Sequence, residues 1–254
     1  MSADASIETR AAMHRNNILA SLRVAGLGPG AACDRVGPWR CMDAGAPEFS
    51  VVNWATILDR ASEADLAVAS GWFEARGLQP VFELRGDLDA ELIQALKRRG
   101  YQQSSAMPEM LLVDPEPPAY DGPLTILEVR TGAELERYGR LNWSPELHHI
   151  GLAVARNSQE LGFHMFLGCL DGEDVAVAAS FVTDDMAGVY NVAVRPDMRR
   201  RGFGEAITWA AIAAALGQGA RHACLGASDM GYPVYARMGF ETRYEYIKLA
   251  APPG

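Results

Sequence analysis

Apolar positions along this chain fall into helix-like and strand-like patterns in two separate stretches. Apolar side chains recur at three- and four-residue steps over residues 65–76, although Gly71 interrupts the pattern, and again over residues 203–216. Further helices are predicted over residues 89–99 and 232–237. Short apolar runs bounded by turn residues predict strands over residues 80–84, 110–113, 163–170, 175–181, 189–194, 222–226 and 244–249. Asp171-Gly172 predicts a hairpin between the two strands that flank it.

The two stretches repeat one order of elements. Each runs helix, glycine, strand, helix, a glycine–aromatic turn and a final strand, and Gly100 superposes on Gly239 at an offset of 139 residues. Prolines between them predict a linker over residues 115–123, because proline fixes φ and removes a backbone donor. We therefore expect an α/β (α+β) protein with domains at residues 1–114 and 124–254. Two unrelated α/β units of similar order are the alternative.

A basic glycine turn, Arg199-Arg200-Arg201-Gly202-Phe203-Gly204, lies between a predicted strand and a predicted helix. Glycines let the backbone close around a ligand, and the free N–H groups of a helix start attract phosphate. The Walker pattern Gly-Lys-Ser/Thr is absent, and the three glycines with a later acidic residue of a dinucleotide fingerprint are absent as well. The turn predicts a different kind of phosphate ligand.

The pattern Arg-x-x-Gly-x-Gly resembles the acyl-CoA pyrophosphate loop of the GNAT superfamily of N-acyltransferases. The resemblance runs from Asn191 through Gly204 and continues in residues 225–228 and 234–240, so that it covers most of residues 124–250. It implies two GNAT-like domains, each a mixed, mostly antiparallel sheet flanked by helices, and an acetyl-CoA-dependent N-acetyltransferase acting on a small-molecule amine. A non-catalytic acyl-CoA-binding or regulatory protein, and acetylation of a protein N-terminus or lysine, are the alternatives.

The resemblance also assigns roles to residues. The backbone of Val192, Ala193 and Val194 would pair with the pantetheine arm, and Tyr235 matches the general acid that protonates the leaving thiolate. The pyrophosphate would be held by Arg199, Arg200, Arg201, Gly202, Phe203, Gly204 and Glu205. Ser228 would contact the cofactor or orient Tyr235, and substrate contacts are expected from Asn191, Trp143 and Glu146.

Several of these residues have a structural alternative. Tyr235 could pack in the core, Ser228 could cap the next helix, and Asn191 could be a buried structural amide. The general base is not identified by the sequence. Its candidates are Glu146, His148, His149, Asp184 and Asp185, with a water chain as a further alternative.

The first half differs from the second at the equivalent turn. Under the offset, the loop falls on Arg60, Glu63 and Asp65, and Tyr235 falls on Leu96. Carboxylates at a helix start favour the helix dipole but repel a pyrophosphate, and Ser62 to Asp65 resembles a capping box. This pattern predicts a degenerate amino-terminal half that lost the cofactor.

Charge and composition narrow the partners. The net charge of −9 disfavours nucleic-acid binding, which depends on clustered basic residues. The four cysteines show no metal-ligand or disulfide spacing, so no metal is expected. We expect no membrane partner and a cytoplasmic location, because the sequence contains neither a signal-peptide pattern nor a long apolar run. A homodimer is compatible with the sequence, which leaves the oligomeric state open.

Overall fold

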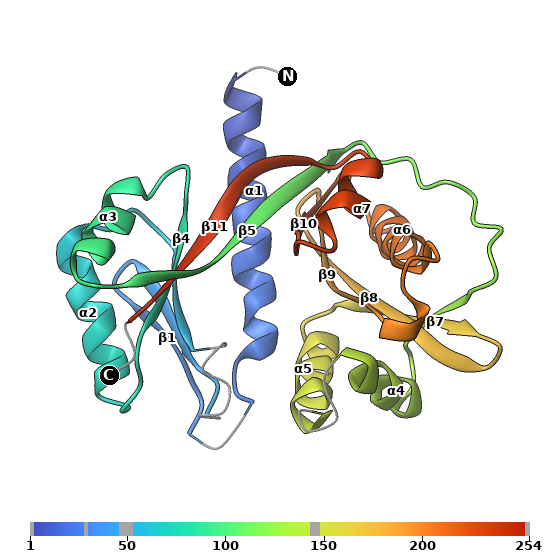
Figure 1. Cartoon of the computed structure of the whole chain (residues 1–254), viewed down its shortest axis with the longest axis horizontal. Helices are drawn as coiled ribbons and strands as arrows, with labels where there is room; N and C mark the ends of the chain where they lie inside the picture. The colour runs from blue at the N-terminus through green and yellow to red at the C-terminus, as the bar shows by residue number, and fades with distance from the viewer. Residues whose placement is uncertain (1–2, 28–29, 46–52, 143–147, 252–254) are drawn as a thin grey trace. The chain divides into compact units, whose positions relative to one another are not determined.

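The computed structural model describes residues 3–27, 30–45, 53–142 and 148–251. Its chain forms two compact units, which are not consecutive segments (Figure 1). Unit 1 contains Met1–Arg23 and Met110–Glu241, and unit 2 contains Val24–Glu109 and Thr242–Gly254. The boundary predicted at residues 115–123 therefore does not coincide with the boundaries of the compact units. Unit 1 also includes the first residues of the chain, and unit 2 includes the last residues.

Long-range pairing explains this difference. The last strand, β11 (Glu241–Ala250), pairs antiparallel with β4 (Val81–Arg85), so that Tyr246 lies opposite Arg85 and Ala250 opposite Val81. Strand β5 (Gln102–Val113) contributes its final residues, from Met110, to unit 1, where it neighbours β10 (His222–Gly226). Unit 1 thus includes the end of the strand that follows the last helix of unit 2 in the sequence. Unit 2 likewise includes the strand that follows the last helix of unit 1.

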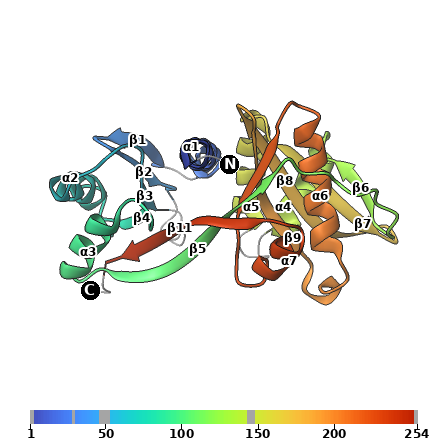
Figure 2. The same ribbon diagram turned by 90° about the horizontal axis from the view of Figure 1, so that it is seen from above.

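Unit 1 is a mixed sheet with helices on both faces (Figure 2). Its strands lie in the order β5-β10-β9-β8-β7-β6, antiparallel except for the parallel pair β9–β10 among the pairings described. Besides β5 and β10, the strands are β6 (Thr125–Glu128), β7 (His164–Leu170), β8 (Glu173–Thr183) and β9 (Met186–Val194). The helices are α1 (Ala3–Ser21), α4 (Gly132–Asn142), α5 (His148–Glu160), α6 (Phe203–Leu216) and α7 (Tyr232–Arg237).

The two faces of this sheet carry separate cores. On one face, α6 packs Phe203, Ile207 and Ala211 against the strands, and its small side chains bring the helix close to the sheet. On the other face, Tyr138 of α4 and Ala20 of α1 pack against Leu167 of β7 and its neighbours. The prolines of residues 115–123 lie in a segment without helix or strand that connects β5 to β6.

Unit 2 is a smaller sheet with two helices on one face. Its strands β1 (Ala32–Val36), β2 (Trp39–Asp43) and β3 (Trp54–Ile57) precede β4, and the order is β1-β2-β3-β4-β11-β5. The helices α2 (Glu63–Glu74) and α3 (Ala90–Arg98) bury Leu66, Phe73 and Leu96 against the sheet. Gly71 lies within α2 without ending it.

None of the helices in the described ranges combines the length and the apolar character that a bilayer crossing requires.

Candidate acyl-CoA site

The turn before α6 leaves the start of that helix open. Arg200 and Gly202 both adopt left-handed conformations, with φ of 61° and 80°, and Gly202 is the N-cap residue. No side chain caps the helix, and among the described residues the N–H groups of Phe203, Gly204 and Glu205 have no acceptor. The first N–H groups of a helix have no partner within it, so three donors point outward at a positive helix end.

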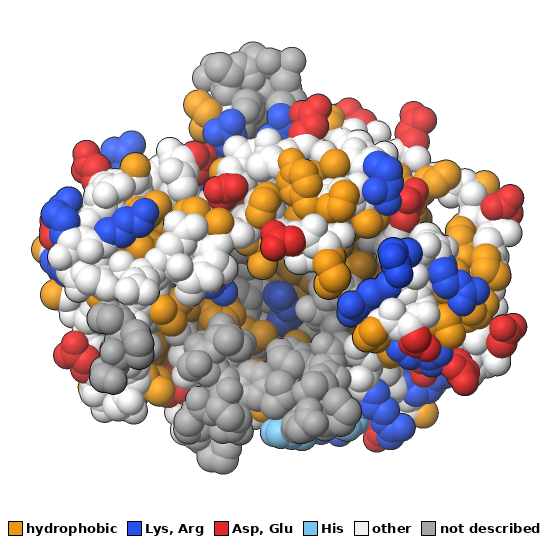
Figure 3. Space-filling view, in the orientation of Figure 1, with side chains coloured by type: hydrophobic (Ala, Val, Ile, Leu, Met, Phe, Trp, Pro, Cys, Tyr) orange, Lys and Arg blue, Asp and Glu red, His pale blue; other side chains and the backbone are white. Residues whose placement is uncertain are grey.

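The arginines of the turn are not neutralised locally. Arg199 donates to the carbonyl oxygen of Val194 at 3.2 Å, and the guanidinium of Arg201 lies 4.9 Å from the Phe203 ring centroid. Within the described part of the chain, no carboxylate forms an ion pair with Arg199, Arg200 or Arg201. Figure 3 shows basic side chains gathered over the region of α6 and α7, on the right of the view. Their charge is therefore available to an anion.

Arg195, by contrast, is already paired. Its guanidinium donates to Glu173 at 2.7 Å and to Asp197 at 2.8 Å. These ion pairs hold the pKa of Asp197 below its usual range through the hydrogen bond from Arg195. Arg195 therefore already has carboxylate partners within the protein, although it is close to the turn in the sequence.

Strand β9 separates from β10 before it reaches the turn. The parallel pairing covers only Met186 to Gly188 of β9, so the later part of β9 has no partner on that side among the described pairings. Opposite β8, the register shifts because Asn191 and Val192 together face the single residue Ala178, which is a β-bulge. Asn191 accordingly has a left-handed φ of 55°. The backbone of Val192, Ala193 and Val194 borders an open strand edge, as a ligand pairing like a strand requires.

Tyr235 lies in the core between α7 and α6. Its ring packs edge-on against Phe240 at 5.9 Å between centroids, and burial raises the pKa of the phenol to about 12. Thr208 of α6, which is fully buried, is a hydrogen-bond partner of the phenol and itself donates to the Gly204 carbonyl oxygen at 2.7 Å. The phenol is thus connected to the first turn of α6 and stays protonated at neutral pH.

A glycine before α7 allows this arrangement. A Cβ on Gly231 would lie 2.7 Å from Cε2 of Tyr235, so only glycine lets the ring take this position. Gly204 is not needed in this way, because a Cβ there would lie 3.6 Å from Cγ2 of Val194, which is an ordinary van der Waals distance. Gly231 and Thr208 were not predicted from the sequence. Their roles depend on contacts between α6 and α7, and no local pattern encodes such contacts.

The structure shows a local structural contact of Ser228. The Gly231 N–H donates to the Ser228 hydroxyl at 3.2 Å and to its carbonyl oxygen at 2.9 Å. Ser228 therefore stabilises the turn that opens α7, where Gly231 rather than Ser228 is the N-cap residue. Its contact with a cofactor stays a prediction.

The substrate-side residues considered first fall into two sets. Trp143 and Glu146 lie outside the described residues. The Nδ2 atom of Asn191 is buried and has no hydrogen-bond partner among the described residues, and the same holds for Nδ1 of His148. The Asn191 amide lies on β9, and the His148 imidazole lies at the start of α5.

The other candidate bases do not converge on the bulge. Asp184 and Asp185 form the β8–β9 turn, about 20 Å along the strand from Asn191 at the usual rise per residue. Asp184 forms an exposed ion pair with Arg15 at 3.4 Å, and His149 is exposed on α5. Asp184 and Asp185 are therefore poor candidates for the base.

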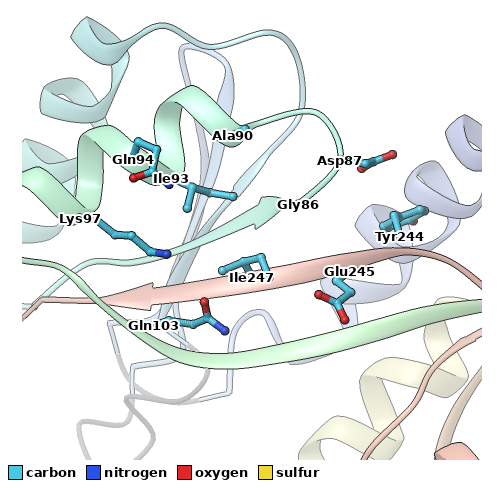
Figure 4. A pocket seen from close by; sticks show the side chains of 10 residues that line it. All are labelled: Gly86, Asp87, Ala90, Ile93, Gln94, Lys97, Gln103, Tyr244, Glu245 and Ile247. Carbon is cyan, nitrogen blue, oxygen red and sulfur yellow. The ribbon is translucent and has the colours of Figure 1, made fainter.

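A separate cavity of about 440 Å³ lies in unit 2, over β11 and beside α3 (Figure 4). Its lining comprises Gly86, Asp87, Ala90, Ile93, Gln94, Lys97, Gln103, Tyr244, Glu245 and Ile247. None of these residues belongs to the glycine turn or to β9. The cavity is therefore distinct from the candidate acyl-CoA site.

Comparison with known proteins agrees with this geometry. Residues 133–233 match the model of the acetyltransferase (GNAT) domain family. This segment is therefore similar to a GNAT acetyltransferase domain. This range includes the bulged strand β9, the basic glycine turn and α6, and it extends to the first residues of α7.

Solved structures share the fold over most of the chain. A GCN5-related N-acetyltransferase from Kribbella flavida is 20% identical, with a TM-score of 0.71 over 94% of this chain and 96% of that one. A tandem GNAT protein from the clavulanic acid biosynthesis pathway is 16% identical, with a TM-score of 0.67 over 94% and 88%. A GCN5-related N-acetyltransferase from Sphaerobacter thermophilus is 15% identical, with a TM-score of 0.62 over 79% and 74%. A search among curated proteins gave no significant match.

Proposed function

We propose that this protein is an acetyl-CoA-dependent N-acetyltransferase of the GNAT type with one working cofactor site, in unit 1. The observation that carries the proposal is the combination of an uncapped helix start at Gly202 with the open edge of β9 beyond Gly188. Free N–H donors and unpaired arginines suit a pyrophosphate, while the open strand edge suits an amide-bearing arm. Both features fit acyl-CoA, which combines the two chemical groups.

Each group of residues has a separate task in this proposal. The N–H groups of Phe203, Gly204 and Glu205 would hold phosphate oxygens, with charge-assisted contacts from Arg199 to Arg201. A backbone N–H near the Asn191 bulge would polarise the carbonyl under attack. Bound acyl-CoA supplies a thioester, which is already activated toward an amine.

Tyr235 is proposed as the proton donor to the departing thiolate. Its high pKa keeps the proton on the phenol at neutral pH, and Thr208 fixes the phenol beside α6. A protein that only binds acyl-CoA has no chemical need for this group. We further propose that the amine belongs to a small molecule and that the first half of the chain is a GNAT-like unit without a cofactor loop.

The activity is tested with purified protein, acetyl-CoA and a panel of primary amines, by following release of the free thiol. We expect amine-dependent thiol release by the wild type. A Tyr235→Phe variant should bind acetyl-CoA with wild-type affinity but release thiol slowly. Tight acetyl-CoA binding without thiol release for any amine, including peptide amines, would instead support the non-catalytic alternative.

A further inference from the structure

Helix α1 contacts strand β9 through the buried side-chain amide of Asn16. Asn16 is fully buried, and its Nδ2 group donates to the carbonyl oxygen of Phe181 at 3.0 Å, the hydroxyl of Thr183 at 2.9 Å and the carbonyl oxygen of Met186 at 3.2 Å. These acceptors belong to the end of β8 and the start of β9. One side chain from the first helix thus joins the two strands at their connecting turn.

The oxygen of the same amide holds Tyr190. The Tyr190 hydroxyl donates to Oδ1 of Asn16 at 2.6 Å. The Arg23 guanidinium covers the Tyr190 ring at 4.6 Å from its centroid, and Phe163 lies 5.7 Å away between centroids. Gly188 leaves the room for this contact, because a Cβ there would overlap Oδ1 of Asn16. The side chain of Tyr190 is therefore fixed at its tip and along its ring.

Tyr190 immediately precedes the left-handed residue Asn191 of the β9 bulge. A non-glycine residue with positive φ persists only where its surroundings determine the backbone on both sides. Pairing with β8 supplies this constraint after the bulge, where Ala193 lies opposite Val177. Before the bulge, the fixed side chain of Tyr190 adds to the pairing of Tyr190 with Ala179.

We propose that Asn16 and Tyr190 are positioning residues for the acyl-CoA strand, so that the amino-terminal helix is part of the working site. The proposal rests on the proposed function, because the bulge matters only if β9 binds the acyl arm. Neither residue touches the reacting atoms. Together they hold the backbone that presents Asn191 and the open edge of Val192 to Val194.

The test compares Tyr190→Phe with Tyr138→Phe in the full-length protein. Each variant removes one phenol hydroxyl from the same core, but Tyr138 lies on α4 and not on the cofactor strand. Amide hydrogen exchange of the ligand-free protein is measured first. We expect exchange over residues 186–194 to rise at least tenfold in Tyr190→Phe and to stay at the wild-type rate in Tyr138→Phe.

Kinetics supply the second readout. We expect Tyr190→Phe to lower kcat/KM for acetyl-CoA about tenfold, with most of the loss in kcat, while Tyr138→Phe keeps the wild-type value. In an Asn16→Ala background, Tyr190→Phe should have no further effect on exchange, because the partner of the hydroxyl is already absent.

Unchanged exchange over residues 186–194 in Tyr190→Phe would overturn the positioning role, whether or not the protein is an acetyltransferase. Equal losses of kcat/KM in the two phenylalanine variants would overturn it as well, since the effect would then be general to the core. Failure of the wild type to bind acetyl-CoA would overturn the proposed function instead, and the exchange experiment would still report on the contact between α1 and β9.

Discussion

The starts of α2 and α6 are equivalent in the order of elements but differ in how their N–H groups are satisfied. At α2, the Ser62 N–H donates to Oδ2 of Asp65 at 2.7 Å, as one half of the predicted capping box requires, and the Ser62 hydroxyl donates to the same oxygen at 2.7 Å. These bonds hold the pKa of Asp65 below its usual range. At α6, Gly202 occupies the cap position and no side chain closes the helix. One start is closed by its own sequence, and the other is open to an anion.

The strands before these helices also differ in how much of their backbone is paired with a neighbouring strand. Three of the four residues of β3, Trp54 to Thr56, pair with β4, whereas β10 pairs with only the first three of the nine residues of β9. The position equivalent to Tyr235 is Leu96, which is buried in the core of unit 2. The comparison indicates that a phosphate site depends on leaving backbone groups unpaired, in addition to having the right fold.

The largest expected effect comes from closing the open turn. Gly202→Glu places a carboxylate among the donors proposed for the pyrophosphate, and like charges in contact cost several kcal/mol. We expect acetyl-CoA affinity to fall by about 100-fold or more in calorimetric titration. Gly219→Glu is the matched control, because Gly219 also has a positive φ, 98°, and free space around it. A similar loss in the control would attribute the effect to backbone strain.

Removing the proposed proton donor should have the next largest effect. Tyr235→Phe deletes only the phenol hydroxyl, and general acid catalysis contributes on the order of 10²-fold or more. We expect kcat to fall by about 100-fold while the Kd for acetyl-CoA stays within about twofold, as measured by steady-state kinetics and calorimetry. A wild-type kcat in this variant would return Tyr235 to a purely structural role.

The pH dependence of kcat should test the same role of Tyr235. Burial raises the pKa of Tyr235 to about 12, above its reference value of 10, so the acid form is retained as pH rises through the ordinary range of tyrosine. We expect kcat to show no loss from this group up to about pH 10. A decline centred near pH 9 in the wild type, which is absent in the Tyr235→Phe variant, would contradict this pKa.

Opening the closed turn should affect stability only. Asp65→Ala removes the acceptor that satisfies the Ser62 N–H, and we expect Tm to fall by about 2–4 °C in thermal unfolding. The lowered pKa of Asp65 gives the sign of the pH effect: its contribution is present above about pH 4 and is lost as pH falls. The difference in Tm between variant and wild type should therefore shrink in acid.

From residue 163 onward the sequence predicted the elements of the chain closely, whereas β6 and α4 were not predicted. The bounds of α6, β10 and α7 agree with the prediction to the residue, because glycines and periodic apolar positions mark their ends. The first half was harder. Strand β5 begins at Gln102 and not at residue 110, since its first part is polar and exposed, and the short strands β1 to β3 were not predicted.

Long-range contacts account for what the sequence did not reveal. The pairing of β11 with β4 joins residues that are far apart in the chain, and no local pattern specifies it. Spacing and resemblance indicated the glycine turn and Tyr235 as site residues, and their roles stay predictions. Local sequence patterns did not indicate Thr208, Gly231 and Asn16, because each contacts a residue on another element.

The most direct test of the central claim is the number of acetyl-CoA molecules bound per chain, measured by calorimetric titration of wild type, Gly202→Glu and Glu63→Gly. The account predicts one site in the wild type, no measurable site in Gly202→Glu and one unchanged site in Glu63→Gly. Two sites in the wild type, or binding retained by Gly202→Glu, would contradict the claim that only the open turn before α6 holds the cofactor.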